Sequence, residues 1–282
     1  MQHPGQDQAT QAGSDNGDVH SHAPFDSLYR PIHCITGQRC IVIGMLVWER
    51  PEPPDRPMPA PLSRERIVHA AIQLADADGL DAVSLRKVAA VLDVGPMRLY
   101  RYIATKEELL DLMVDTVHTE IRPVGDSWRE VLRSLAETTR QATHRHEWLA
   151  DLIGGRPQLG PNALAAGEAV LAGMDGIDLE TVVPAVSAVN AYVIGAVRRE
   201  ITERRAERLS GMDIKQWQAT FGPYLQRTFA TGRFPALATV VRDGPHLEAD
   251  QTFRIGLDLL LDGIEARISD RHATEGPDRH RA

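Results

Sequence analysis

The stretch "VAAVLDVGPMRLYRYIATKEELLDLMVD", residues 88–115, decides the fold of the chain. Apolar residues recur in it at helical spacing and are interrupted by a turn near Asp93 to Gly95. Pro96 suits the first position of a new helix, because an N–H group there would have no partner. Thr105 and Glu108 have the spacing of a capping box, which predicts the start of another helix. The stretch therefore predicts a helix, a tight turn, a short second helix and then a third, which is the helix-turn-helix arrangement.

The residues around this stretch also indicate helices. Ser63 and Ser84 are good N-cap residues, and Gly79 is a good end for the first helix. Val83 and Val88 have the spacing of a hydrophobic staple. From residue 126 onward, apolar stripes at helical spacing alternate with Gly and Pro, and the two longest cover residues 179–209 and 252–268. Almost nothing alternates with period two, so we expect an all-α fold.

The composition divides the 282 residues into four parts. Residues 1–60 are polar and Pro-rich around one isolated apolar run, so we expect a disordered extension or spacer there, with Met45 as an alternative start of translation. Residues 61–121 are expected to form the helix-turn-helix domain. Residues 122–270 are expected to form a larger helical domain, and residues 271–282 a disordered tail.

The short second helix carries an unusual group of side chains for an acidic chain. With Val94, Leu99 and Ile103 facing inward, residues 96–102 are expected to form a short rod whose other side chains point into solvent. Arginines on such a rod can pair with guanine edges in the major groove, and tyrosines can reach phosphates. The alternative is a solvated helix face without a partner. The residues predicted to contact DNA are Ser84, Arg86, Lys87, Pro96, Met97, Arg98, Tyr100, Arg101, Tyr102 and Lys106.

The charge distribution favours DNA binding by this segment alone. The formal net charge of the chain is −8, which does not favour non-specific attraction to nucleic acid. Residues 62–106, however, hold seven Lys or Arg against five Asp or Glu, so their net charge is +2 and that of the remaining residues is −10. The longest apolar run, residues 41–48, is far shorter than the roughly 20 residues of a membrane helix. We therefore expect a cytoplasmic protein with no membrane association.

Residues 62 to about 121 resemble the N-terminal domain of the tetracycline-repressor (TetR) family. The resemblance lies in A-x-x-L-A-x-x-x-G-L from Ala71, S-L-R-K-V-A from Ser84, L-Y-R-Y from Leu99 and T-K-E-E-L-L from Thr105. It departs from the family at Asp93, where Gly is usual. Asp tolerates the left-handed conformation better than most residues, so the turn is expected to survive. The segments "EWLADLIGGRPQLGPNAL" and "FRIGLDLLLDGIEARI" look like the subgroup with a tetracycline-repressor-like C-terminal domain.

The resemblance implies a homodimer, a near-palindromic double-stranded operator and a small-molecule effector. It places the subunit interface on the segments 179–209 and 252–268, although these stripes could instead line the domain's own core. The residues expected there are Val186, Val189, Val193, Phe253, Leu257, Leu260 and Leu261. Large aromatic residues with a polar edge suit an effector pocket, and they also suit a plain core. The residues expected in the pocket are Trp148, Tyr192, Trp217 and Phe221.

These features favour a repressor that a small apolar ligand releases from its operator. The alternative is a constitutive helix-turn-helix regulator whose C-terminal half binds a protein partner. An enzyme is not expected, because the chain has no Gly-rich phosphate loop, nucleophile elbow or cluster of His, Cys and carboxylates. No cofactor is expected. His144 and His146 are two residues apart and would face different sides of a helix, which disfavours a shared metal ion.

Overall fold

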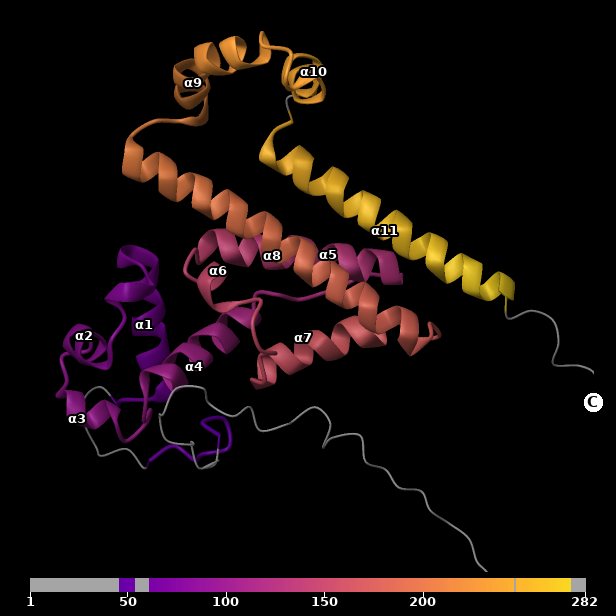
Figure 1. Ribbon diagram of the computed structural model, residues 1–282. Coiled ribbons are helices and arrows are strands. Elements are labelled where there is room, and N and C mark those ends of the chain that lie inside the picture. The colour runs from indigo at the N-terminus through magenta and orange to yellow at the C-terminus, as the bar shows by residue number, and fades with distance from the viewer. Residues whose placement is uncertain (1–45, 54–60, 246, 275–282) are drawn as a thin grey trace, which may run out of the picture. The chain divides into compact units, whose positions relative to one another are not determined.

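The computed structural model describes residues 46–53, 61–245 and 247–274, and within these it contains helices and no strand (Figure 1). This agrees with the all-α prediction. The expectations for residues 1–45, including Met45, lie outside the described residues. The helices are α1 (Arg64–Asp78), η1 (Leu80–Ala82, a 3₁₀ turn), α2 (Leu85–Val91), α3 (Pro96–Leu99), α4 (Lys106–His118), α5 (Trp128–Arg145), α6 (Leu149–Leu152), α7 (Pro161–Ala172), α8 (Leu179–Ser210), α9 (Ile214–Phe229), α10 (Pro235–Asp243) and α11 (Ala249–Thr274).

The predicted helix starts and the predicted turn are confirmed. The side chains of Ser63, Ser84 and Thr105 each accept a hydrogen bond from the backbone N–H three residues later, at 3.1–3.2 Å. Asp93 has a φ of 52° and is the single non-glycine residue with positive φ in the described part of the chain. A short polar side chain tolerates this conformation, so the turn between α2 and α3 forms without glycine at that position.

The predicted rod from residue 96 to residue 102 is shorter than expected. Helix α3 ends at Leu99, and the chain continues through a turn in which the Tyr102 N–H donates to the Leu99 carbonyl at 2.9 Å. This turn carries Tyr102 inward beside Ile103, so that Tyr102 is only 4% exposed. The expectation that Tyr102 points outward was wrong, because the helix that would have presented it ends three residues earlier.

At the start of α4, one of the two hydrogen bonds of the predicted capping box differs, namely the one made by the Glu108 carboxylate. Glu108 accepts from the N–H of Ala104 at 2.7 Å, one residue before the N-cap, and from the Arg50 guanidinium at 2.5 Å. Burial raises the pKa of Glu108, but the Arg50 hydrogen bond and the Ala104 N–H hold it below its ordinary value. The same contact corrects the expectation for residues 46–53. They pack on the helix-turn-helix domain, with Val47 buried.

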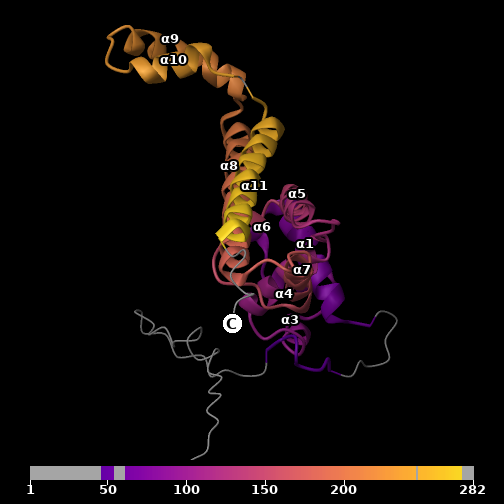
Figure 2. The same ribbon diagram turned by 90° about the vertical axis from the view of Figure 1, so that its right-hand side faces the viewer.

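The larger domain is built around α8. Helix α8 packs against α5, α6 and α11, and α8 and α11 lie side by side in both views (Figures 1 and 2). Among the described helices, α8 is the one long and apolar enough to span a membrane, yet its inner face belongs to the protein core, as in a central helix of a soluble protein. Helix α11 continues to Thr274, past the predicted boundary at residue 270. Near its end, Arg271 pairs with Asp178, the N-cap of α8.

Helices α9 and α10 connect α8 to α11 and bury none of their residues (Figure 1). Their large apolar side chains are exposed, and this group comprises Ile214, Trp217, Phe221, Tyr224, Phe234, Leu237, Val240 and Val241. An apolar surface of this extent is typical of an interaction site rather than of a solvated surface.

Candidate DNA-binding surface and ligand pocket

The exposed face of α2 and α3 carries basic and aromatic side chains. Met97 is 77% exposed and Tyr100 is 50% exposed, while Arg98 between them is partly buried. Leu99 and Ile103 are fully buried beneath them and fix α3 on the domain. Pro96 is also exposed at the first position of α3. Anchored from below, this short helix presents its outer side chains in one orientation, as groove recognition requires.

The five cations predicted to contact DNA share one property. Within the described residues, their side chains form no hydrogen bond and no ion pair, and these residues are Arg86, Lys87, Arg98, Arg101 and Lys106. By contrast, arginines in the larger domain such as Arg140 and Arg205 are held by carboxylates at 2.6–3.1 Å. Unpaired cations are available for phosphates and base edges. Ser84 is occupied as the N-cap of α2, and Tyr102 is buried, so neither shares this property.

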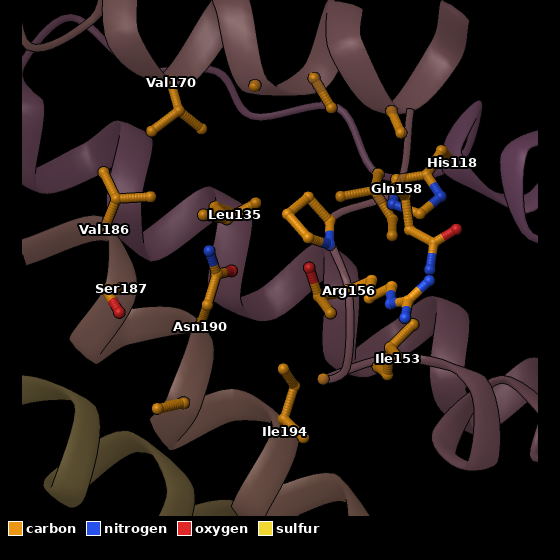
Figure 3. A pocket seen from close by; sticks show the side chains of 18 of the residues that line it. His118, Leu135, Ile153, Arg156, Gln158, Val170, Val186, Ser187, Asn190 and Ile194 are labelled. Atoms are coloured by element: carbon orange, nitrogen blue, oxygen red, sulfur yellow. The ribbon is translucent and has the colours of Figure 1, made fainter. Parts of the chain in front are cut away.

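A cavity of about 670 Å³ lies in the larger domain, within the size range of small-molecule sites (Figure 3). Its walls come from the end of α4, from α5, from the loop after α6, from α7 and from α8. Apolar side chains form most of this wall, and they include Ile121, Leu135, Ile153, Val170, Val186 and Ile194. Such a lining suits a ligand with a large apolar body.

Polar side chains lie on two sides of this cavity. Figure 3 shows His118, Gln158 and Arg156 on one side, and Ser187 and Asn190 on the other. These residues come from α4, from the loop after α6 and from α8, which are far apart in the sequence. None of them was predicted, because only the packing of the three elements brings them to one cavity.

The four aromatic residues predicted for the pocket do not line it. Trp148 is buried and donates its indole N–H to Asp76 on α1 at 2.7 Å. Tyr192 donates its hydroxyl to the Phe253 carbonyl on α11 at 2.7 Å. Trp217 and Phe221 contact each other on the exposed face of α9, with ring centroids 4.8 Å apart. The four residues miss this cavity for two reasons: Trp148 and Tyr192 pack between helices, and Trp217 and Phe221 lie on the exposed helix α9.

One helix takes part in both candidate sites. Helix α4 begins at Lys106, beside the exposed face of α3, and ends at His118 in the pocket wall. Between them, the Asp115 carboxylate is 6% exposed and accepts from the N–H groups of Asn162 and Ala163, each at 3.0 Å, and from the Asn162 side-chain amide at 2.9 Å. These donors belong to the first turn of α7, so a residue of α4 caps a helix of the pocket wall.

Glycine at position 160 allows this cap to form. A Cβ atom at Gly160 would lie 2.2 Å from the Asp115 carboxylate oxygen, so another residue would push the start of α7 away from α4. The contact therefore depends on two residues: the buried Asp115 on α4 and Gly160, which has no side chain, directly before α7.

The residues predicted for a subunit interface face mostly inward. Of the seven, Val189, Val193, Phe253, Leu257 and Leu261 are buried within the single chain, Leu260 is partly buried, and Val186 lines the pocket. The buried five fit the alternative that these stripes line the domain's own core, and the subunit interface stays a prediction. Of the exposed residues on these helices, Val183, Ser187 and Ala191 of α8 also line the cavity, whereas Gly195 on α8 and Ile255, Leu259 and Gly263 on α11 do not. These residues follow one another at four-residue spacing.

The described residues contain no group of three or more His, Cys, Asp or Glu side chains that could hold a metal ion. His146, considered above, is instead placed between two carboxylates. Its Nδ1 lies 2.8 Å from Asp76 and its Nε2 lies 3.3 Å from Glu120. This contact helps to join α1 to the larger domain.

Comparison with known proteins covers both domains. Residues 67–113 match the model of bacterial regulatory proteins of the tetR family, and residues 123–268 match the tetracyclin repressor-like C-terminal domain. The transcriptional repressor DrrR1 of Streptomyces coeruleorubidus is 37% identical over 82% of this chain and 88% of its own length. The class D tetracycline repressor of Escherichia coli is 27% identical over 74% of this chain and 92% of its own length. The structure of ActR from Streptomyces coelicolor in complex with actinorhodin has a TM-score of 0.65 at 28% identity, covering 74% of this chain and 98% of ActR.

Proposed function

The chain belongs to the TetR family of DNA-binding transcriptional regulators, and from this premise we propose that it is a homodimeric repressor released from its operator by a small molecule in the 670 Å³ cavity. Regulators of this family are not enzymes, so the function is reversible binding at two coupled sites. The protein works in the cytoplasm, where its DNA is accessible.

The observation that supports this function best is the reach of α4. Its 13 residues extend over about 20 Å, from Lys106 next to the DNA-binding face to His118 in the cavity. A ligand that displaces His118 or α7 therefore acts on α4, which packs on α1 of the DNA-binding domain and begins a few residues after α3. Release of DNA requires only that the ligand binds more tightly to the conformation in which α3 is misplaced.

Two α3 helices in a two-fold dimer would enter successive major grooves about 34–36 Å apart, so the operator is expected to be a near-palindrome. Met97, Arg98 and Tyr100 make the contacts to base edges. Contacts to phosphates come from the flanking cations Arg86, Lys87, Arg101 and Lys106.

The dimer is proposed to form through the exposed faces of α8 and α11. Leu259, which is 69% exposed, lies at the centre of the α11 stripe between Ile255 and Gly263. On α8, the exposed small residue Gly195 would let a partner helix approach closely. An exposed apolar stripe on a long helix has no stabilising role in a monomer, which favours this surface over the inward-facing residues.

Replacement of Leu259 by glutamate is expected to dissociate the dimer, because each subunit would bury an unpaired charge in the proposed interface. The operator affinity should then fall at least about tenfold, since one molecule no longer holds two half-sites. Sedimentation velocity and operator fluorescence polarisation measure the two effects. Val124→Glu, at an exposed apolar residue outside α8 and α11, is the matched control. A dimeric Leu259→Glu protein with full operator affinity would contradict this interface.

Replacement of Ala166 by tryptophan tests the role of the cavity. Ala166 lies on α7 in the cavity wall, so a large side chain there is expected to fill part of the space without touching α3. The variant should bind the operator normally but resist small molecules that release the wild-type protein. Polarisation of labelled operator during a compound screen measures this. Equal release of both proteins by every active compound would place the effector site elsewhere.

The constitutive alternative is not favoured, because a protein-binding module has no need for an internal cavity of this size. A ligand-responsive repressor does need one.

A further inference from the structure

The lining of the cavity carries a positive charge and no negative charge among the described residues. Its lining contains no Asp and no Glu among the described residues, and its ionisable side chains are Arg156 and His118. This is unusual for a chain whose formal net charge is −8. A site with a permanent positive charge and no carboxylate attracts anions and disfavours cations.

The loop that carries Arg156 is fixed against α8. Arg198 on α8 donates from Nε to the Ala150 carbonyl at 3.0 Å and from Nη2 to the Ile153 carbonyl at 2.6 Å. Gly154 follows with a φ of 91°, a conformation that favours glycine, and a Cβ there would lie 3.0 Å from Ile194. The backbone that precedes Arg156 is therefore held in place at the cavity wall.

The Arg156 side chain is available to a ligand. It is exposed at the cavity and forms no hydrogen bond or ion pair with any described residue. Most arginines of the same domain, in contrast, are paired, as Arg198 is with backbone carbonyls and Arg205 is with Asp151. A guanidinium in this position can bind a carboxylate or a similar anion through two parallel hydrogen bonds.

The second polar group, His118, complements an acid that carries a hydroxyl. Its Nδ1 lies 2.8 Å from the Val114 carbonyl, which can only accept, so Nδ1 must carry the proton. In the neutral ring, Nε2 is then an acceptor, and it is the ring nitrogen left for a ligand. Figure 3 shows His118, Gln158 and Arg156 on the same side of the cavity, with Asn190 and the apolar Val186 on the opposite side.

We propose that the effector is an acidic amphiphile, with an anionic group that binds Arg156 and an apolar body that lies along α5, α7 and α8. The inference rests on the proposed function, because it names the chemical class of ligand for the same cavity. The positive side of the cavity gives selectivity against neutral and cationic compounds of equal shape. His118 and Asn190 then distinguish among acids by their hydroxyl and carbonyl groups.

A matched pair of fluorescent probes tests the proposal on the full chain. The probes are 8-anilinonaphthalene-1-sulfonate and N-phenyl-1-naphthylamine, which share one aromatic body and differ by the anionic group. The dissociation constant of each is measured for the wild-type protein and for the variants Arg156→Gln, Arg156→Lys, Ala166→Trp and Arg227→Gln. Arg227 is an arginine of the exposed helix α9, so its variant controls for probe bound at the apolar surface. The melting temperature of each variant verifies folding.

The expected result is that Arg156→Gln weakens binding of the sulfonate about tenfold or more and leaves binding of the neutral probe unchanged, as loss of a charge-assisted hydrogen bond requires. Arg156→Lys should retain most of the affinity, Arg227→Gln should change neither, and Ala166→Trp should weaken both. If Ala166→Trp weakens the neutral probe but Arg156→Gln affects the two probes equally or not at all, the anionic class is wrong and the cavity remains a ligand site. If Ala166→Trp changes neither probe, the proposed function of the cavity fails, and this inference fails with it.

Discussion

Replacement of Arg98 by alanine is expected to weaken operator binding by about 1–3 kcal/mol, or roughly 5- to 150-fold, while the protein remains folded and dimeric. Arg98 lies between the exposed residues Met97 and Tyr100 and is partly buried, and its guanidinium has no partner among the described residues. A guanidinium that reads a guanine edge contributes both affinity and discrimination. The loss should therefore be largest on the best operator and small on unrelated DNA, as measured by fluorescence polarisation on both.

Two neighbouring variants separate base reading from other roles of this segment. Lys106→Ala should weaken binding equally on all sequences and reduce the salt dependence, because a lysine at the start of α4 is placed for a phosphate. Tyr102→Phe should leave DNA binding essentially unchanged, because that ring is buried. If the Arg98→Ala protein binds the operator with wild-type affinity and specificity, α3 is not part of the recognition surface.

Replacement of Asp115 by alanine is expected to have the second large effect. It should lower the stability of the protein and weaken the coupling between the cavity and the DNA-binding domain. It leaves three donors of the first turn of α7 without their buried acceptor, which costs about 2–3 kcal/mol. It also removes the buried hydrogen bonds that join the pocket wall to α4. The variant should melt at a lower temperature and, below that temperature, bind the operator but release it less completely when an effector is added. Calorimetry and operator titration with and without effector measure these changes.

Asp111→Asn on the same helix is the control for Asp115. Burial raises the pKa of Asp111, and the nearby Glu108 and Glu107 raise it further, so its ionised form is disfavoured in the folded protein. With a folded-state pKa above the unfolded one, ionisation destabilises the fold at neutral pH, and the neutral amide should keep or slightly increase stability. Equal loss of coupling in both variants would show that the acid on α4 acts through charge and not through the cap on α7.

The helix-turn-helix domain could be predicted because its signals are local. A cap such as Ser84 and a turn such as that at Asp93 involve neighbours within a few residues, so the sequence contains the whole interaction. The same reasoning failed at Tyr102, since a four-residue helix has no periodicity long enough to locate its end. It also missed the contact between Arg50 and Glu108, whose partners are 58 residues apart.

The larger domain was predicted only as a set of helices. Periodicity indicates that α8 has an apolar face, but it does not indicate which neighbour covers that face. The helix in fact has two such faces, an inner one with Val189 and Val193 and an outer one with smaller residues such as Ala191 and Gly195. The cavity also depends on which helices pack against each other, because it is the volume that their side chains leave unfilled. One signal for it is an arginine between glycine and proline in "GGRPQ", within the segment that resembles the family's C-terminal domain.

The central claim is that the outer face of α3 recognises a two-fold DNA site. Purified protein should be incubated at physiological salt with sheared genomic DNA from the organism that encodes it, and the bound fragments should be sequenced. Strong enrichment of a near-palindromic site, with half-sites one helical turn apart, that is lost in the Arg98→Ala variant is the predicted result. Recovery of no enriched site, or of the same site with undiminished enrichment by the Arg98→Ala variant, would contradict the claim.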